Sequence, residues 1–301
     1  MSAYPSVGVV VPTRGRPELH AAVASILAQR YPGELRLAVV CDGGELPPGI
    51  DSDSRVEVLH NTRTPGLAGT RNTGTLALET ELIAFCDDDD QWQPGKLRMQ
   101  VEALQRCPGA EMASCGIVVR YGEQSKPRLI GRDSVSYQDL LRSRMVMVHS
   151  STYLLRRDAL LDGIGLADEN IPYGQSEDWD LALRAARRNP IAFVDRPLVR
   201  VSWGRSSYFR YDWETRAQGL LWMLRSHPDI AASPVGAARV YGQLAFGYAC
   251  LGRRHDALLW TRRALRRNWR ERRAPIALAV AAGLVSGDSV LHRLHSLGHG
   301  I

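Results

Sequence analysis

The chain has 301 residues, of which 45% are hydrophobic and 23% are charged. This length suits one large domain or one domain with an appendage, and the composition excludes a disordered or low-complexity protein. Five cysteines without a CxxC pair indicate reduced thiols in an intracellular protein rather than a disulfide scaffold. The N-terminus lacks the features of a signal peptide, and the longest later apolar run, 276–285, is about half a membrane span. We therefore expect a cytoplasmic protein.

The formal net charge is +6, and arginines crowd the stretch 251–274. The simplest interpretation is a solvated helix face. The alternative is a surface that meets anionic lipid headgroups or an acidic partner, which would place the protein peripherally at the inner face of a membrane. Nucleic acid is not expected as a partner, because the aromatic residues are not interleaved as a base-stacking surface requires. The sequence does not predict the oligomeric state.

Apolar runs and helical patterns alternate through the first hundred residues. The run at 7–13 is continuously β-branched, which is typical of a strand buried on both faces. Further strands are expected at 35–44, 55–61 and 81–90, and helices at 16–31, 67–80 and 91–104. This alternation predicts right-handed βαβ units and a mostly parallel, Rossmann-like α/β sheet flanked by helices.

The pattern changes twice in the rest of the chain. Between about 110 and 212 it is mixed, with strands expected at 111–122 and 196–203 and helices at 137–144 and 177–189. From 213 onward it is helical only, and 237–268 reads as a helical hairpin that resembles a single tetratricopeptide unit. We predict an α/β domain over 1–212 and an all-helical extension over 213–301.

Three predicted strands end on polar residues, namely Thr13, Asp42 and Asp87. In open α/β sheets, ligands bind outside the carboxyl ends of the strands. Four consecutive aspartates, 87–90, stand at one such end, and carboxylate oxygens suit Mg²⁺ or Mn²⁺. Asp87 and Asp89 are separated by one residue, so one of these acids can point at a sugar hydroxyl and the other at the metal. The alternative is that these acids favour the start of the helix at 91–104, but one acid suffices for that.

Five motifs together resemble the inverting glycosyltransferases of family 2. They are VVVPTRGRP (9–17), VVCDGG (39–44), GLAGTRNTG (66–74), FCDDDDQWQPGKL (85–97) and SEDWDLALR (176–184). Their order and approximate spacing are similar to those of that family over about residues 5–212. The resemblance implies a GT-A fold and transfer of a sugar from a nucleoside-diphosphate sugar, with UDP favoured, to an acceptor hydroxyl. It also implies that a DXD motif holds Mg²⁺ or Mn²⁺.

The resemblance assigns roles to individual residues. Asp89 would bind the metal, Asp178 would be the catalytic base, and Glu177 and Trp179 would shape the acceptor site. The remaining matched residues would bind the nucleotide sugar: Pro12, Thr13, Arg14, Asp42, Arg71, Asp87 and Asp88.

The role of Asp178 also follows from the chemistry of inverting transfer, in which an acceptor hydroxyl loses its proton while it attacks the anomeric carbon. A carboxylate within hydrogen-bond reach of that hydroxyl can take the proton. The alternative is purely structural: Ser176 caps a helix and the acids that follow favour its N-terminus.

The chain departs from the family pattern at one place. Many relatives have a histidine shortly after the last core strand that reaches the metal or the diphosphate, and Ser202 stands there in this chain. Arg205 is a candidate to compensate by pairing with the diphosphate. His149 either lines the acceptor site or is structural.

Two other functions remain open at this stage. A sugar-nucleotide nucleotidylyltransferase would need a glycine-rich phosphate loop with a lysine directly after the first strand, and 12–19 lacks it. A catalytically idle scaffold whose helical tail binds a partner would show no metal-dependent binding of nucleoside diphosphates.

Overall fold

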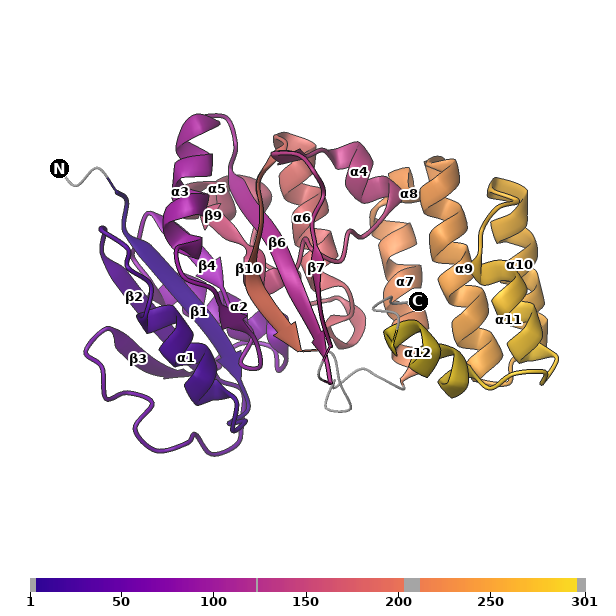
Figure 1. The fold of residues 1–301 in the computed structure, drawn as a ribbon, viewed down its shortest axis with the longest axis horizontal. Coiled ribbons are helices and arrows are strands. Elements are labelled where there is room, and N and C mark those ends of the chain that lie inside the picture. Colours follow the sequence, from indigo (N-terminus) through magenta and orange to yellow (C-terminus); the bar gives the residue numbers. More distant parts are fainter. Residues whose placement is uncertain (1–3, 123, 203–211, 297–301) are drawn as a thin grey trace.

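The computed structural model describes residues 4–122, 124–202 and 212–296 of the chain. One sheet with helices on both faces occupies most of the molecule, and a stack of helices extends it at one end of the long axis (Figure 1). The α/β architecture and the helical C-terminal region predicted from the sequence are confirmed.

Four parallel strands form the N-terminal half of the sheet, in the order β3-β2-β1-β4. They are β1 (Val7–Thr13), β2 (Leu35–Cys41), β3 (Val56–His60) and β4 (Leu82–Phe85), joined in part by α1 (Leu19–Leu27) and α2 (Leu67–Ala77). Val7 pairs with Leu35 on one side and Leu82 on the other. Because these strands run in one direction from a common level, their carboxyl ends lie along one edge of the sheet.

The rest of the sheet is mixed rather than parallel. Its order continues as β9-β6-β10-β5; β9 runs antiparallel to β4 and β6, while β6 and β10 are parallel. The strands are β5 (Gln91–Trp92), β6 (Met112–Tyr121), β7 (Gln124–Arg128), β8 (Ser134–Val135), β9 (Leu154–Arg156) and β10 (Ile191–Ser202). Four of these six have two to five residues, which is too short for a recognisable alternation. The expectation of a mostly parallel sheet therefore holds only for its first half.

The strand β1 contributes to a core on each face of the sheet. Val9 and Val11 pack in one cluster with residues of α1 and α3, whereas Val10 packs in the other with residues of α6. Burying such a side chain contributes roughly 1.5–3 kcal/mol. The helix α2 lies close to β1 because Gly74 has no side chain: a Cβ there would stand 2.4 Å from Cγ1 of Val10.

The helical elements that flank the mixed half of the sheet vary in length. They are α3 (Lys96–Arg106), α4 (Tyr137–Arg142), η1 (Ser150–Thr152), α5 (Arg157–Ala159), η2 (Leu160–Ile164), η3 (Pro172–Gly174) and α6 (Glu177–Arg188). Among them, η1 and the start of α6 bring side chains to the carboxyl end of β4, as described below.

The C-terminal region is helical throughout its described residues. It consists of α7 (Trp213–Ser226), α8 (Pro228–Ala232), α9 (Pro234–Cys250), α10 (Arg254–Arg267), α11 (Arg273–Ala281) and α12 (Gly287–Ser296). The predicted hairpin is formed by α9 and α10, and Ala245 of α9 is buried in a cluster with Trp213, Ala277 and Leu291 of α7, α11 and α12. The boundary after residue 212 stays a prediction. Within the described residues, no helix has the length and apolar character needed to cross a bilayer.

Candidate active site

The first strand ends directly beside the aspartate run. Thr13 is buried, and its Oγ1 donates a hydrogen bond of 2.7 Å to Asp88 Oδ2. The same oxygen accepts from the backbone N–H of Gly15 at 3.0 Å, which shapes the loop after β1. Pro12 is buried within β1, whereas Arg14 is exposed. Thr13 and Asp88 are therefore brought together, and Arg14 lies at the surface of the same loop.

Asp42 directly follows the second strand and organises the start of α2. Its two carboxylate oxygens accept from Asn61 Nδ2 at 2.6 Å and from the backbone N–H of Gly66 at 2.8 Å. Gly66 is the residue before the first turn of α2 and has φ 116°, a conformation that favours glycine. Asp42 thus sits half-buried at a helix N-terminus, where a negative charge is favourable.

The four aspartates after β4 are held by four different neighbours. Asp87 accepts from Ser150 Oγ at 3.0 Å, Asp88 from Thr13, Asp89 from Arg16 Nη1 at 2.9 Å, and Asp90 from Ser151 Oγ at 2.5 Å. The helix that follows begins at Lys96 after Gly95, and no side chain caps it. The run therefore does not cap that helix, and the structural alternative raised by the sequence is excluded.

The protonation of these carboxyl groups differs along the run. Burial raises the pKa of Asp89 to about 6, and the Asp87 carboxylate adds to this effect. Burial also raises the pKa of Asp88, and it raises that of Asp90 strongly. Burial opposes ionisation of Asp87 too, but the Arg71 guanidinium outweighs it and lowers the pKa of Asp87. A bound cation would therefore displace protons from this cluster.

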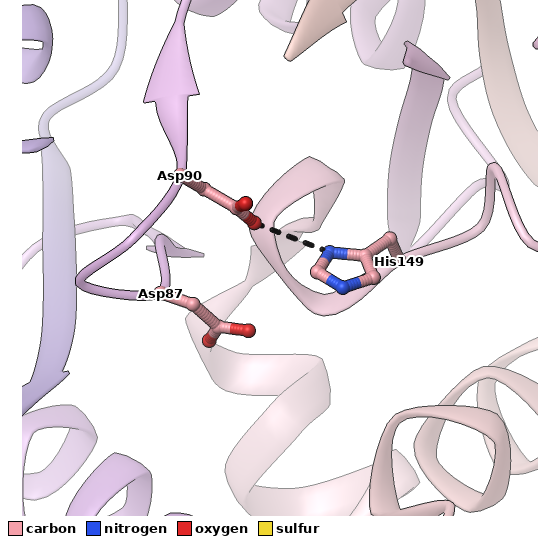
Figure 2. Close-up of side chains that lie close together, drawn as sticks. All are labelled: Asp87, Asp90 and His149. Atoms are coloured by element: carbon pink, nitrogen blue, oxygen red, sulfur yellow. Dashed lines mark ion pairs between the residues drawn. The ribbon is translucent and has the colours of Figure 1, made fainter. Parts of the chain in front are cut away.

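Three side chains in this cluster suit a metal ion. Asp87, Asp90 and His149 each offer a ligand atom, and these atoms all lie within 4.8 Å of one another (Figure 2). His149 Nδ1 is 3.5 Å from Asp90 Oδ2, and it also accepts from the backbone N–H of Ser151 at 3.3 Å. Two carboxylates and an imidazole form a donor set that fits a divalent cation. The structure thus groups Asp90 and His149, whereas the predicted ligand Asp89 pairs with an arginine.

A buried arginine joins the aspartate run to the start of α6. Arg71 is 2% exposed; its Nη2 donates to Asp87 Oδ1 at 2.6 Å and its Nη1 to Glu177 Oε1. Its guanidinium also lies over the Phe85 ring at 5.7 Å. Arg71 therefore fixes two acids from distant parts of the chain. Its role in binding the nucleotide sugar stays a prediction.

The predicted base, Asp178, lies in the first turn of α6 and is 5% exposed. Arg144 Nη2 lies 2.8 and 2.7 Å from its two carboxylate oxygens, and the backbone N–H of Trp179 donates to Oδ1 at 2.7 Å. Burial opposes ionisation, but Arg144 outweighs it and lowers the pKa of Asp178. The carboxylate is consequently ionised at neutral pH, as a proton acceptor must be.

One expectation around the start of α6 needs correction. Ser176 does not cap the helix, because it adopts a left-handed conformation with φ 69° and makes no capping bond; Glu177 and Asp178 accept the first N–H groups instead. Glu177 is occupied by Arg71 and is 5% exposed. Trp179 is 3% exposed and donates from Nε1 to the Leu140 carbonyl at 3.1 Å. Glu177 and Trp179 therefore hold the start of α6 in place, and their part in shaping an acceptor site stays a prediction.

Several residues at this site had no signal in the sequence. Ser150 and Ser151 lie on η1, which is three residues long, and Arg144 lies in the irregular segment before it. These three residues are assigned to the site only because they contact aspartates in the structure. Ser202 ends β10 opposite Arg120 and has no described contact with the aspartate run, and Arg205 lies outside the described residues.

Comparisons with known proteins agree with this arrangement. The model of the family described as "Glycosyl transferase family 2" matches residues 8–163, about half of the chain. The UDP-Glc:alpha-D-GlcNAc-diphosphoundecaprenol beta-1,3-glucosyltransferase WfgD of Escherichia coli is 33% identical over 196 residues, which are 63% of this chain and 73% of WfgD. The pre-mycofactocin glycosyltransferase of Mycobacterium tuberculosis (strain CDC 1551 / Oshkosh) is 29% identical over 64% of this chain, and the match spans only 43% of that relative.

Solved structures show the same fold. TarS 1–349 of S. aureus in complex with UDP-GlcNAc superimposes with a TM-score of 0.62 at 14% identity, over 98% of this chain and 92% of that one. The mannosyltransferase PcManGT of Pyrobaculum calidifontis, in complex with GDP-Man and Mn²⁺, gives 0.54 at 19% identity, over 98% and 81%. With the family model matching the strands and the aspartate run, these results show that the chain is a glycosyltransferase of the GT-A fold and belongs to glycosyl transferase family 2.

Proposed function

We propose that the chain is an inverting, metal-dependent enzyme that moves a sugar from a nucleoside-diphosphate sugar to an acceptor hydroxyl. The observation that supports this best is the Arg71 bridge, which places Asp87 at the end of β4 next to Glu177 at the start of α6. A cation-binding acid cluster and an ionised carboxylate on α6 thereby belong to one site. A UDP-sugar is favoured as donor, since WfgD is named for UDP-Glc and TarS was solved with UDP-GlcNAc.

Asp178 takes the proton of the acceptor hydroxyl in this mechanism. The acceptor oxygen forms a bond to the anomeric carbon while the bond from that carbon to the diphosphate oxygen breaks, and the electron pair leaves with the nucleoside diphosphate. Attack from the face opposite the leaving group inverts the anomeric centre. Arg144 and the Trp179 N–H hold the Asp178 carboxylate in place, and the lone pair that remains on Oδ2 can accept the proton.

The aspartate run and the strand ends would bind the donor. Asp87, Asp90 and His149, with Asp89 beside them, are the residues that would hold Mg²⁺ or Mn²⁺, and the imidazole favours Mn²⁺ because Mg²⁺ sites use oxygen ligands. Such an ion, when bound, neutralises charge on a diphosphate leaving group. Thr13 and Asp42 lie at the neighbouring strand ends, where the nucleoside would bind, and Asp88 is held by Thr13.

Two substitutions separate chemistry from donor binding. We expect Asp178→Asn to lower kcat about 10²–10⁴-fold, because the amide cannot take a proton, while UDP binding with Mn²⁺ stays unchanged by calorimetry. Asp89→Ala should weaken the Mn²⁺-dependent part of UDP binding, and removal of the metal with EDTA should abolish transfer by the unsubstituted enzyme.

Asp51→Asn is a matched control, since Asp51 is exposed and has no described contact with the aspartate run. It should leave both transfer and UDP binding unchanged. Full turnover by Asp178→Asn would refute its role as base, and transfer that persists in EDTA would refute metal dependence. If UDP bound without any effect of Mn²⁺ and no sugar nucleotide were consumed, the protein would be a scaffold rather than an enzyme of this mechanism.

A further inference from the structure

The positive charge of the molecule is concentrated in its last helices. Residues 251–301 contain ten arginines and three acidic residues, whereas residues 1–250 contain almost equal numbers of basic and acidic side chains. Residues 251–301 therefore carry a formal charge of +7, and the region of α10 to α12 accounts for the positive net charge of the chain. Figure 1 shows α10 and α11 at the end of the molecule farthest from β2 and β3.

The outer side of α10 combines this charge with exposed apolar side chains. Leu258 and Leu265 are 54% and 37% exposed, and they are seven residues apart, so they share one side of the helix. Trp269, two residues beyond the end of α10, is 74% exposed. Ala257, Thr261 and Ala264 form the opposite, buried side. We call the outer side with its neighbours the α10 face: Arg254, Leu258, Arg262, Leu265, Arg266 and Trp269.

The arginines of the α10 face have no acidic partner in the described part of the chain. Arg254, Arg262 and Arg266 are exposed, and no carboxylate there forms an ion pair with them. The neighbouring Arg253 is different, because its Nε lies 2.8 Å from Asp256 Oδ2. A row of unpaired cations around exposed leucines is stable only in water or against an anionic surface.

We propose that the α10 face docks the enzyme peripherally on an anionic lipid bilayer. The arginines would meet the lipid phosphates, while Leu258, Leu265 and Trp269 would enter the boundary between headgroups and acyl chains. A second copy of the chain fits less well, because a symmetric contact through this face would set unpaired arginines against each other. Nucleic acid also fits less well, because leucines, not stacked aromatic rings, lie between the arginines.

Vesicle co-sedimentation tests this proposal. The full chain should bind vesicles of phosphatidylcholine with 30–50% phosphatidylglycerol, and binding to pure phosphatidylcholine should be much weaker. The triple variant Arg254→Gln/Arg262→Gln/Arg266→Gln should lose about 100-fold in apparent affinity, at about fivefold for each arginine near such a surface. Trp269 fluorescence should shift to the blue on binding, and the shift should be absent in Trp269→Phe.

A matched variant tests whether vesicle binding depends on the location of the arginines or only on the net charge of the protein. Arg30→Gln/Arg98→Gln/Arg106→Gln removes three exposed arginines from the sheet domain and should bind vesicles like the unsubstituted chain. Asp178→Asn should also bind vesicles like the unsubstituted chain. The proposal of membrane docking can therefore be refuted without refuting the proposed transfer reaction, and the reverse also holds. Equal losses in the two triple variants would overturn the proposal, as would equal binding to both kinds of vesicle. Dimerisation that is abolished by Leu258→Ser/Leu265→Ser, without vesicle binding, would replace it with a self-association surface.

Discussion

The aspartate run and the α10 face are two highly charged parts of this protein that differ in burial and pairing. The acids of the first have partners within the chain, whereas the arginines of the second are exposed and unpaired among the described residues. Every aspartate from 87 to 90 has a partner within the chain, and Asp88 and Asp90 are buried. The arginines Arg254, Arg262 and Arg266 are exposed and have no acidic partner among the described residues. The aspartates are therefore held by hydrogen bonds and ion pairs within the protein. The arginines interact with solvent or with a surface outside the molecule.

This difference reflects the cost of removing charge from water. A buried carboxylate must be paired, hydrogen-bonded or protonated, which explains both the partners of the aspartates and the raised pKa values of Asp89 and Asp90. An exposed guanidinium keeps its hydration and needs no partner. Substitutions in the first segment should therefore affect folding and catalysis, whereas those in the second should affect only encounters with other surfaces.

The largest effect on stability is expected at Arg71. Arg71→Met removes the cation between Asp87 and Glu177 and leaves two carboxylates close together in a buried place. Breaking such a pair costs about 3–5 kcal/mol, so urea unfolding should shift to a clearly lower midpoint. Arg98→Met is the control, because Arg98 forms only an exposed pair with Glu102 at 3.8 Å, and the loss there should stay below about 1 kcal/mol.

Neutralising the two acids sharpens this prediction. Asp87→Asn/Glu177→Gln in the Arg71→Met background should recover a large part of the lost stability, because the uncompensated charges are then gone. If Arg71→Met alone cost less than 1 kcal/mol, the bridge would not organise the site, and the comparison between buried and exposed charges would not hold.

The sequence predicted the first half of the sheet well, because its strands are continuous apolar runs. The strand at 7–13 was located correctly, and the strands expected at 35–44 and 55–61 end three residues and one residue early. The fourth strand ends at Phe85, so the aspartates lie beyond it rather than within it. The short strands β5, β7, β8 and β9 were missed, since pairing across the sheet, not local pattern, makes them strands.

Only those residues of the candidate site that lie within a recognisable motif could be predicted from the sequence. The aspartate run, Asp42 and Asp178 come from segments that resemble the family pattern, and the structure places them at strand ends and at a helix start. Ser151 contacts them from the three-residue helix η1 and Arg144 from the segment after α4, and no motif marks either residue. Partners of this kind follow from the tertiary fold and could not be assigned from the sequence.

A smaller effect is expected from Arg144, which pairs with Asp178 but is half exposed. Burial works against ionisation of Asp178, and Arg144 holds its pKa below the usual value, so kcat should fall only at low pH. Arg144→Gln removes this cation, which raises the pKa of Asp178 and moves the acidic limb of the kcat profile upward by about one pH unit. Arg144→Lys keeps the charge and should leave the limb near its original position. An unchanged profile in Arg144→Gln would show that Asp178 does not govern that limb.

The smallest effect is expected on the α10 face, and its sign is opposite to that at Arg71. Arg262 and Arg266 are four residues apart on one side of α10, and like charges at this spacing destabilise a helix by about 0.2–0.5 kcal/mol. Glutamine has a similar helix propensity, so Arg262→Gln should slightly raise the free energy of unfolding at low ionic strength. The gain should disappear at about 1 M salt, where the screening length falls to about 3 Å. A loss of more than 1 kcal/mol would mean that Arg262 has a stabilising partner within the protein, and the α10 face would then no longer be free for an external surface.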